Sequence, residues 1–282
     1  MIFRKDSRVG TADYSLAKKN YPVLSELVNE RGLSIVLNTV FFVLLFFELS
    51  ALFSPANSFS IPEKLHYDLT WGVIKTGEAE LEVRQTSDEI QLISKANSSA
   101  LASMFYRVED LVISTIKKGE NKGYCEGFIG VPHDYRIIIR EGRQQRNKEF
   151  IMNHSAKKVT YINYLTKEKK EFGINESTLD PLSSFYYIRT LPLEVGKSVF
   201  IDVFDSKKLY KAEVQVLKRE VIETSSGSFK TVLIKPIVRS EGIFFRKGDI
   251  LIWLTDDSRK IPVMLKTKVG LGWVKAVLVG GQ

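Results

Sequence analysis

Two adjacent carboxylates, Asp256 and Asp257, are the residues whose types could most directly perform acid–base chemistry. Such a pair can divide the roles of general acid and general base, or it can hold a hard cation. The pair stands between Trp253 and Ile261, however, in a segment whose pattern predicts a β-hairpin, and Asp followed by Ser is typical of turns. No third ligand and no glycine at EF-hand spacing accompanies it. The pattern therefore favours a turn, with a hydrolytic acidic centre as the alternative.

Other kinds of catalysis have weaker support in the sequence. The chain of 282 residues has three histidines (His66, His133 and His154), none in a recognisable triad context, and it has no G-x-S-x-G motif. Its single cysteine, Cys125, excludes an intramolecular disulfide and a CxxC metal site, and we expect it in the core. Residues 270–272 lack the third glycine and the helix of a phosphate loop. We predict no catalytic residue, no metal site and no cofactor.

Aromatic residues are the candidates for an apolar ligand cavity, as in the mouth of a β-barrel. Aromatic side chains also commonly fill β cores, so the two roles remain open. A barrel of many strands, however, is difficult to fill with side chains alone. The candidate cavity residues are Tyr67, Trp71, Tyr106, Tyr186, Trp253 and Trp273, accompanied by Phe105 and Tyr187.

Positive charge is concentrated in one part of the chain. The formal net charge is +8, and residues 133–172 carry ten basic residues against five acidic ones. In an exported domain, this excess favours anionic lipid headgroups, glycolipid phosphates or an acidic partner protein, and the alternative is a solvated hairpin. No helix-turn-helix, RNP-like or finger motif indicates nucleic-acid binding. The candidate headgroup contacts are Arg136, Arg140, Arg143, Arg146, Lys157 and Lys158.

An apolar run at residues 35–53 is long enough to cross a bilayer, which takes about 20 residues as a helix. Lys18, Lys19 and Arg31 precede the run, and no Lys or Arg follows it until Lys64. By the positive-inside rule, the N-terminus is cytoplasmic and the rest of the chain lies across the membrane.

Whether this run is cleaved remains open. Ala56 and Ser58 form the small-x-small pattern that signal peptidase recognises, whereas the long leader and the length of the run favour an uncleaved anchor. We predict a cytoplasmic leader at residues 1–33, a signal peptide or membrane anchor at 34–58, and an exported domain at 59–282. That domain is expected to be periplasmic, or anchored in the inner membrane through residues 35–53.

The exported part alternates between apolar and polar residues, which predicts strands with one buried face. Residues 73–84, 209–216 and 261–269 are clear examples, and turn signals separate such runs at 141–142, 225–227, 247–249 and 256–258. The mostly regular spacing of about a dozen or more strands indicates a large antiparallel β-barrel, half-barrel or sandwich.

One short helix is predicted at residues 180–189. Asp180 is a good N-cap, Pro181 suits the first helical position, and apolar residues follow at helical spacing. The predicted fold is therefore all-β with one short helix, preceded by the N-terminal hydrophobic helix.

Several stretches resemble the bacterial envelope family catalogued as domain of unknown function 3108. They occur in order across nearly all of the exported part: residues 63–72 (EKLHYDLTWG) with 76–79 (TGEA), 105–110 (FYRVED), 180–189 (DPLSSFYYIR), and 252–257 (IWLTDD) with 261–263 (IPV). The resemblance implies a signal-bearing, mostly β protein of Gram-negative bacteria. It carries over no catalytic residues.

These observations together predict a non-enzymatic protein of the cell envelope that binds a lipid, an amphipathic envelope molecule or a partner protein. In this hypothesis the aromatic residues hold acyl chains and the basic stretch meets phosphates. The alternatives are a hydrolase of an envelope polymer that uses Asp256 and Asp257, and a structural or assembly factor that acts through its surface.

Overall fold

The structure is a computed structural model, which describes residues 60–118, 128–237, 250–269 and 272–281. All of these belong to one compact unit, Asn57–Gln282. The predictions for residues 1–33 and 34–58, for Cys125 and for the turn at 247–249 lie outside the described residues. Within the described ranges, no helix is both long and apolar enough to cross a membrane.

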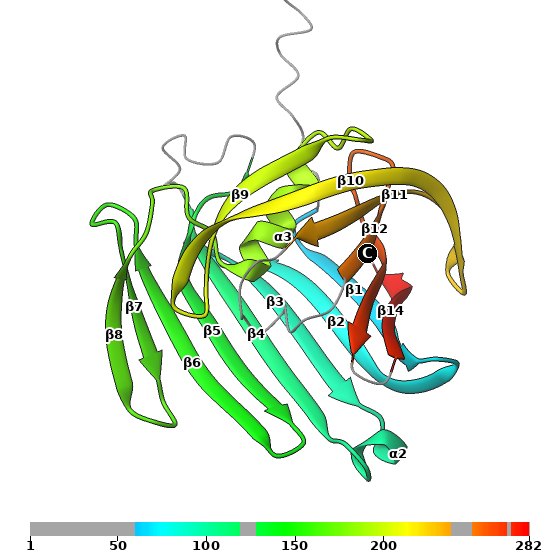
Figure 1. Ribbon diagram of the computed structural model, residues 1–282, viewed down its shortest axis with the longest axis horizontal. Helices are drawn as coiled ribbons and strands as arrows, with labels where there is room; N and C mark the ends of the chain where they lie inside the picture. Colours follow the sequence, from blue (N-terminus) through cyan, green and yellow to red (C-terminus); the bar gives the residue numbers. More distant parts are fainter. Residues whose placement is uncertain (1–59, 119–127, 238–249, 270–271, 282) are drawn as a thin grey trace, which may run out of the picture. The chain divides into compact units, whose positions relative to one another are not determined.

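The described residues form a single antiparallel sheet of fourteen strands with two helices, which confirms the predicted all-β class (Figure 1). The strands are β1 (Glu63–Trp71), β2 (Ile74–Gln85), β3 (Glu89–Ser98), β4 (Val108–Lys117), β5 (Pro132–Glu141), β6 (Gln144–Asn153), β7 (Lys158–Asn163), β8 (Glu168–Gly173), β9 (Ser198–Asp205), β10 (Lys208–Thr224), β11 (Gly227–Ile237), β12 (Ile250–Thr255), β13 (Pro262–Val269) and β14 (Gly272–Gly281). The helices are α2 (Ala100–Ser103), which the sequence analysis did not predict, and α3 (Pro181–Thr190).

The strand order follows the chain except at one point. It runs β8-β7-β6-β5-β4-β3-β2-β1-β14-β13-β12-β11-β10-β9, so the first and last strands lie side by side in the middle of the sheet. Leu69 of β1 pairs with Gly77 of β2 on one side and with Ala276 of β14 on the other. This arrangement leaves β8 and β9 as the two edges.

Period-two alternation produces the expected two-faced strands. On β2, Val83 is fully buried, whereas Glu80 and Glu82, at the alternate positions, lie on the opposite face. There the Nζ of Lys95 on β3 lies 3.1 Å from an oxygen of Glu80 and 3.7 Å from one of Glu82. One face of the sheet is therefore apolar, and the other carries charged cross-strand pairs.

The two sheet edges are connected by side chains. In the described residues no backbone ladder joins β8 to β9, but Lys207 Nζ lies 2.9 Å from both carboxylate oxygens of Glu168. The rings of Phe172 and Phe204 lie 5.7 Å apart. Leu179 also forms an isolated parallel bridge with β9. The structure is thus a strongly curved, barrel-like sheet whose edges are joined by side-chain contacts and by the backbone bridge of Leu179, and not by a ladder between β8 and β9.

Helix α3 begins as the sequence predicted. The carboxylate of Asp180 accepts hydrogen bonds from the backbone N–H groups of Leu182 (2.8 Å) and Ser183 (3.0 Å), and Pro181 occupies the first helical position. Asp180 also accepts a 2.6 Å hydrogen bond from the hydroxyl of Ser114 on β4. Burial raises the pKa of Asp180, and these hydrogen bonds oppose that rise.

The sheet curves around α3, which packs against β3, β4 and β9 (Figure 1). Seven of its ten residues are buried, so this helix fills the interior rather than covering an outer face. Near its C-terminal end, Arg189 is fully buried and makes two 2.7 Å hydrogen bonds to the carboxylate of Glu63 on β1. Both ends of the helix are therefore attached to the sheet, through Asp180 at one end and Arg189 at the other.

Removing one partner of the Arg189–Glu63 pair will destabilise the fold strongly. Arg189→Met leaves a buried carboxylate without its cation, so we expect a loss of about 3–5 kcal/mol in the free energy of unfolding. The double variant Glu63→Leu/Arg189→Met removes both charges and should lose less than the single variant. Urea unfolding of the wild type, of the single variants Arg189→Met and Glu63→Leu, and of the double variant measures the coupling energy between the two side chains. Additive losses from the two single variants would show that the pair contributes nothing specific.

Candidate ligand-binding cavity

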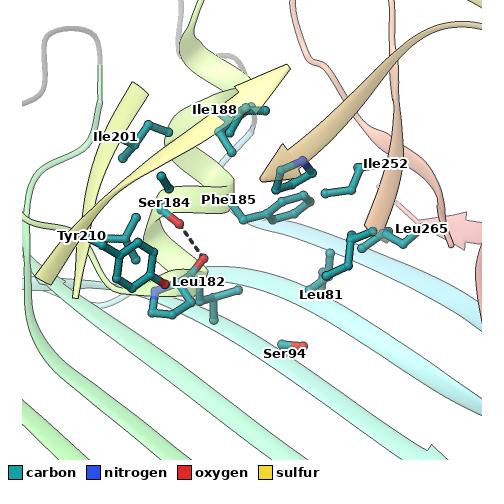
Figure 2. Close-up of a pocket in the computed structure, with 16 residues that line it drawn as sticks. Leu81, Ser94, Leu182, Ser184, Phe185, Ile188, Ile201, Tyr210, Ile252 and Leu265 are labelled. Carbon is teal, nitrogen blue, oxygen red and sulfur yellow. Dashed lines mark hydrogen bonds between the residues drawn. The ribbon is translucent and has the colours of Figure 1, made fainter. Parts of the chain in front are cut away.

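An apolar cavity of about 170 Å³ lies between α3 and the concave face of the sheet (Figure 2). Leu182, Phe185 and Ile188 of α3 form one wall. The facing wall comes from strands in both halves of the sheet, on either side of the β1–β14 pair, and it includes Leu81 of β2 and Ile252 of β12. Strands that are far apart in the sequence thus converge on one helix.

Three polar side chains line this cavity, and none of its described lining residues carries a carboxylate, an imidazole, an amine, a guanidinium or a thiol. Ser184 donates its hydroxyl hydrogen to the carbonyl of Pro181 at 2.9 Å, within the helix (Figure 2). Ser94 of β3 and Tyr210 of β10 are the other two. A cavity with this lining can hold an apolar group, but it offers no carboxylate, imidazole or amine for acid–base catalysis.

The volume limits what can enter. An engineered apolar cavity of about 150 Å³ admits a benzene molecule. The cavity under α3 is therefore large enough for the end of one acyl chain or for one apolar side chain. A complete two-chain lipid does not fit in it.

None of the six candidate aromatic residues lines this cavity. Three of them are buried elsewhere in the structure. Tyr67 donates a hydrogen bond to the carbonyl of Pro262 at 2.9 Å, Tyr186 lies under the guanidinium of Arg189, and Trp253 donates its indole N–H to Glu220 at 2.8 Å. All three side chains are buried and pack within the protein core.

The other three, Trp71, Tyr106 and Trp273, lie together at one end of the sheet. Trp71 and Tyr106 are exposed, at 44% and 54%; Trp71 ends β1, and Tyr106 belongs to the β3–β4 connection. Trp273 is the second residue of β14, and its carbonyl accepts a hydrogen bond from the backbone N–H of Gly72. The structure thus gathers half of the candidates, but at the surface.

Sequence periodicity had indicated part of the true lining. Tyr210, Ala212 and Val214 alternate on the predicted core face of β10, and all three line the cavity. Leu182 and Phe185 follow the predicted helical spacing. The pattern marks these residues as inward-facing, but it does not indicate that a space remains between them.

The six basic candidate residues do not form one patch. Arg140 and Arg143 lie at the β5–β6 turn, whereas Lys157 and Lys158 lie at the other end of β6, roughly 30 Å away along ten residues of strand. Arg146 pairs in register with the buried Ile139, so it lies on the inner face of the sheet.

Most of these cations already have acidic or aromatic partners. Lys157 and Lys158 lie 3.0 and 3.1 Å from Glu176 and Glu171. Arg140 lies 3.6 Å from Glu109. Arg136 stacks on Tyr164, with its guanidinium carbon 4.1 Å from the ring centroid, and the hydroxyl of Tyr164 donates to Glu149.

A second cavity, of about 230 Å³, lies where the sheet edges approach each other. Lys148, Lys207 and Lys208 line it with Asp205 and Tyr161. Burial lowers the pKa of Lys148, and the nearby cations Arg146 and Lys207 lower it further. This cavity is polar, and Glu168 already neutralises one of its lysines, Lys207.

The adjacent carboxylates Asp256 and Asp257 both have structural partners. Asp257 accepts hydrogen bonds from the hydroxyl of Thr255 (2.7 Å) and from the backbone N–H groups of Arg259 and Lys260 (3.0 Å each). Asp256 forms a 2.8 Å ion pair with Arg219 of β10. No cluster of three or more metal-ligating side chains occurs in the part of the chain that the structure describes.

Residues 66–279 match the family described as "Protein of unknown function (DUF3108)". Among curated proteins there is no match. Among solved structures, the chain is similar to a β-barrel-like protein of domain of unknown function DUF1849 from Brucella abortus, with a TM-score of 0.51, 12% identity, and coverage of 79% of this chain and 98% of that one. This similarity shows a shared fold.

Two further solved structures match less closely. One is a predicted exported protein with a YmcC-like fold from Bacteroides fragilis NCTC 9343 (TM-score 0.29, 8% identity, coverage of 79% and 97%). The other is a predicted lipoprotein from Parabacteroides distasonis ATCC 8503 (TM-score 0.30, 8% identity, coverage of 81% and 100%).

Substitutions at the two adjacent carboxylates will have unequal effects on stability. Asp257→Ala removes three hydrogen bonds from a tight turn and should cost about 1–2 kcal/mol in the free energy of unfolding. Asp256→Ala removes one exposed ion pair and should cost less than about 1 kcal/mol. Chemical denaturation of the two variants tests this, and an equal loss for both would contradict the assigned turn roles.

Asp134 on β5 will make stability depend on pH. Burial, reinforced by the neighbouring Glu149, raises the pKa of Asp134 to about 6, from about 3.9 in an unfolded chain. Between these values the folded state binds the proton more tightly, so this group's contribution to stability falls as the pH rises through about 4 to 6.

The difference in unfolding free energy between wild type and Asp134→Asn isolates this contribution. This difference in unfolding free energy should change by on the order of 1 kcal/mol between about pH 4 and pH 6, because solvent screening reduces the full effect of the pKa shift. Urea unfolding at a series of pH values measures it. A difference that stays constant with pH would contradict the raised pKa.

Proposed function

The chain belongs to the DUF3108 family, and we propose that it is a non-enzymatic binding protein of the bacterial cell envelope, which holds the end of an apolar chain in the cavity under α3. The observation that carries this proposal is the lining of that cavity, which is mostly apolar and has no acidic, basic or thiol side chain among its described residues. Burial of a hydrocarbon group there is favourable at roughly 0.8 kcal/mol per methylene.

The ligand class follows from the size of the cavity. A space of about 170 Å³ accepts the end of one acyl tail, while the rest of the ligand stays outside it. We therefore propose a single-chain lipid, or one chain of an amphipathic envelope molecule. An apolar side chain of a partner protein is the alternative occupant.

The proposed location is outside the cytoplasm. The apolar run at residues 35–53, with basic residues before it and none until Lys64, supports export or anchoring by the positive-inside rule. We propose a periplasmic domain, either released or anchored in the inner membrane.

A hydrolase remains the alternative activity, and no contact favours it. Asp256 and Asp257 are the acidic pair that it would use, but Asp256 pairs with Arg219 and Asp257 bonds within its turn. Neither of them lines the cavity under α3.

The cavity is tested with a photoactivatable fatty acid that carries its reactive group near the chain end, added to the full chain. We expect cross-links, mapped by mass spectrometry, on peptides that contain α3 and β12. Ser94→Phe places a phenyl ring in a cavity of about the size that accommodates benzene, and should reduce these cross-links roughly tenfold, equivalent to about 1.4 kcal/mol of binding free energy.

The matched control is Ser225→Phe, the same substitution at an exposed position in the β10–β11 turn. It should leave the cross-links unchanged. Equal yields from both variants, or cross-links confined to residues 35–53, would refute binding in this cavity.

A further inference from the structure

One end of the sheet carries an unusual group of exposed apolar side chains, which we call the apolar rim. Its members come from the β1–β2 turn and from the β3–β4 connection that contains α2 (Figure 1). Val73 is 100% exposed and Phe105 is 90% exposed. The rim consists of Trp71, Val73, Ile74, Leu101, Met104, Phe105 and Tyr106.

Strand pairing brings these connections together. The backbone N–H of Ser99 donates to the carbonyl of Thr76 at 2.8 Å, which ties the β3–β4 connection to the start of β2. The ring of Tyr106 lies over Gly142 in the β5–β6 turn, where a Cβ would come within 2.7 Å of it. The rim is thus one continuous end of the sheet, formed by neighbouring connections.

The fold does not need apolar residues at the rim. Helix α2 has no buried residue, and polar contacts order it: Ser99 caps its first turn, and the hydroxyls of Ser98 and Ser103 lie 2.6 Å apart. Backbone hydrogen bonds from Phe105 and Tyr106 to the carbonyl of Ala102 continue the turn. The connection is therefore held by hydrogen bonds while its large apolar side chains point into solvent.

The exposed area is large for a surface without a partner. An aromatic side chain offers about 150–250 Å², so the three rim aromatics alone expose roughly 300–400 Å² at the fractions observed. The largest apolar patch on a typical monomer covers about 300–600 Å² and is often functional, so the rim aromatics together expose an area of that order.

Three lysines flank the rim on β13 and β14. Lys266 and Lys275 are direct cross-strand partners, although like charges in that position destabilise a sheet. Lys266 Nζ lies 4.5 Å from the centroid of the Trp273 ring, and Lys268 is exposed on the same strand. Within the described ranges, no carboxylate pairs with Lys266, Lys268 or Lys275.

We propose that the apolar rim docks this domain onto the surface of an anionic phospholipid bilayer. Trp71 and Tyr106 enter the interface, where amphipathic aromatic rings are favoured, and Phe105 with the other apolar tips adds buried apolar area. The three lysines lie beside the tips and meet the lipid phosphates, so the charge of the rim complements that of the bilayer.

A bilayer fits this surface better than a protein partner does. The most exposed side chains are at the tips of separate turns, and a protein partner would need a matching pocket for each. The fluid interface of a bilayer can accept all of these side chains, because it has no fixed shape that they must match. Rim docking is independent of cavity binding, because no rim residue lines the cavity under α3.

The test uses the full chain with Cys125→Ser, so that one new cysteine carries a nitroxide label. Val73→Cys places the label at the rim, and Val221→Cys places it at an exposed valine on β10, away from the rim. The protein is held in neutral phosphatidylcholine nanodiscs and titrated with vesicles of phosphatidylcholine, with or without phosphatidylglycerol. Accessibility to oxygen and to a polar relaxation agent reports whether each label enters a bilayer.

We expect the label at residue 73 to move from water to the bilayer only with vesicles that contain phosphatidylglycerol, while the label at 221 stays in water. Each lysine near an anionic surface contributes roughly fivefold in affinity. The triple variant Lys266→Gln/Lys268→Gln/Lys275→Gln should therefore need about 100-fold more vesicles. Circular dichroism and thermal unfolding check that it folds.

Three results would overturn the proposal. A label at residue 73 that stays in water with both vesicle types would leave a protein partner as the occupant of the rim. Equal insertion at residues 73 and 221 would refute docking by this end of the sheet. Insertion that neither phosphatidylglycerol nor the lysine variant affects would refute recognition of an anionic surface.

Discussion

The buried pair between Arg189 and Glu63 is the interaction on which the arrangement of the interior depends. It joins the last turn of α3 to the first strand, across 126 residues of sequence, through two parallel hydrogen bonds. Removing two charges from water is costly, and a bidentate geometry with no exposed side-chain surface offsets that cost most effectively. At the other end of the helix, the buried carboxylate of Asp180 binds Ser114 on β4. Helix α3 is thus attached to the sheet at both ends.

The cavity is a consequence of that attachment. A helix of ten residues fills only part of the concave face of a fourteen-stranded sheet. Since both ends of α3 are attached, the helix cannot simply shift to close the remaining space between Phe185 and the strands opposite. Protein interiors are otherwise close-packed, so an apolar space of this size next to a fixed helix is the natural place for a ligand.

The cavity and the rim serve different physical purposes in our proposals. The cavity excludes water from a hydrocarbon group on the concave face, while the rim presents apolar tips and lysines at one end of the sheet. A protein that held one chain of an envelope molecule and also docked on a bilayer would combine the two properties. Neither property requires an ionisable catalytic group, which agrees with the ion pair of Asp256 and the turn contacts of Asp257.

Local sequence patterns specify the strands and the start of the helix. Alternation specifies which face of β2, β10 and β13 is buried, and Asp180 with Pro181 specifies where α3 begins, because these features depend on neighbouring residues only. Tertiary structure alone decided which inward-facing residues line a space. Whether Leu182 or Tyr186 borders the cavity depends on how α3 lies in the curved sheet, and Glu63, far away in the sequence, sets that position. Hairpin geometry likewise separates Arg140 from Lys157, since the two ends of a strand lie apart however close their residues are in the chain.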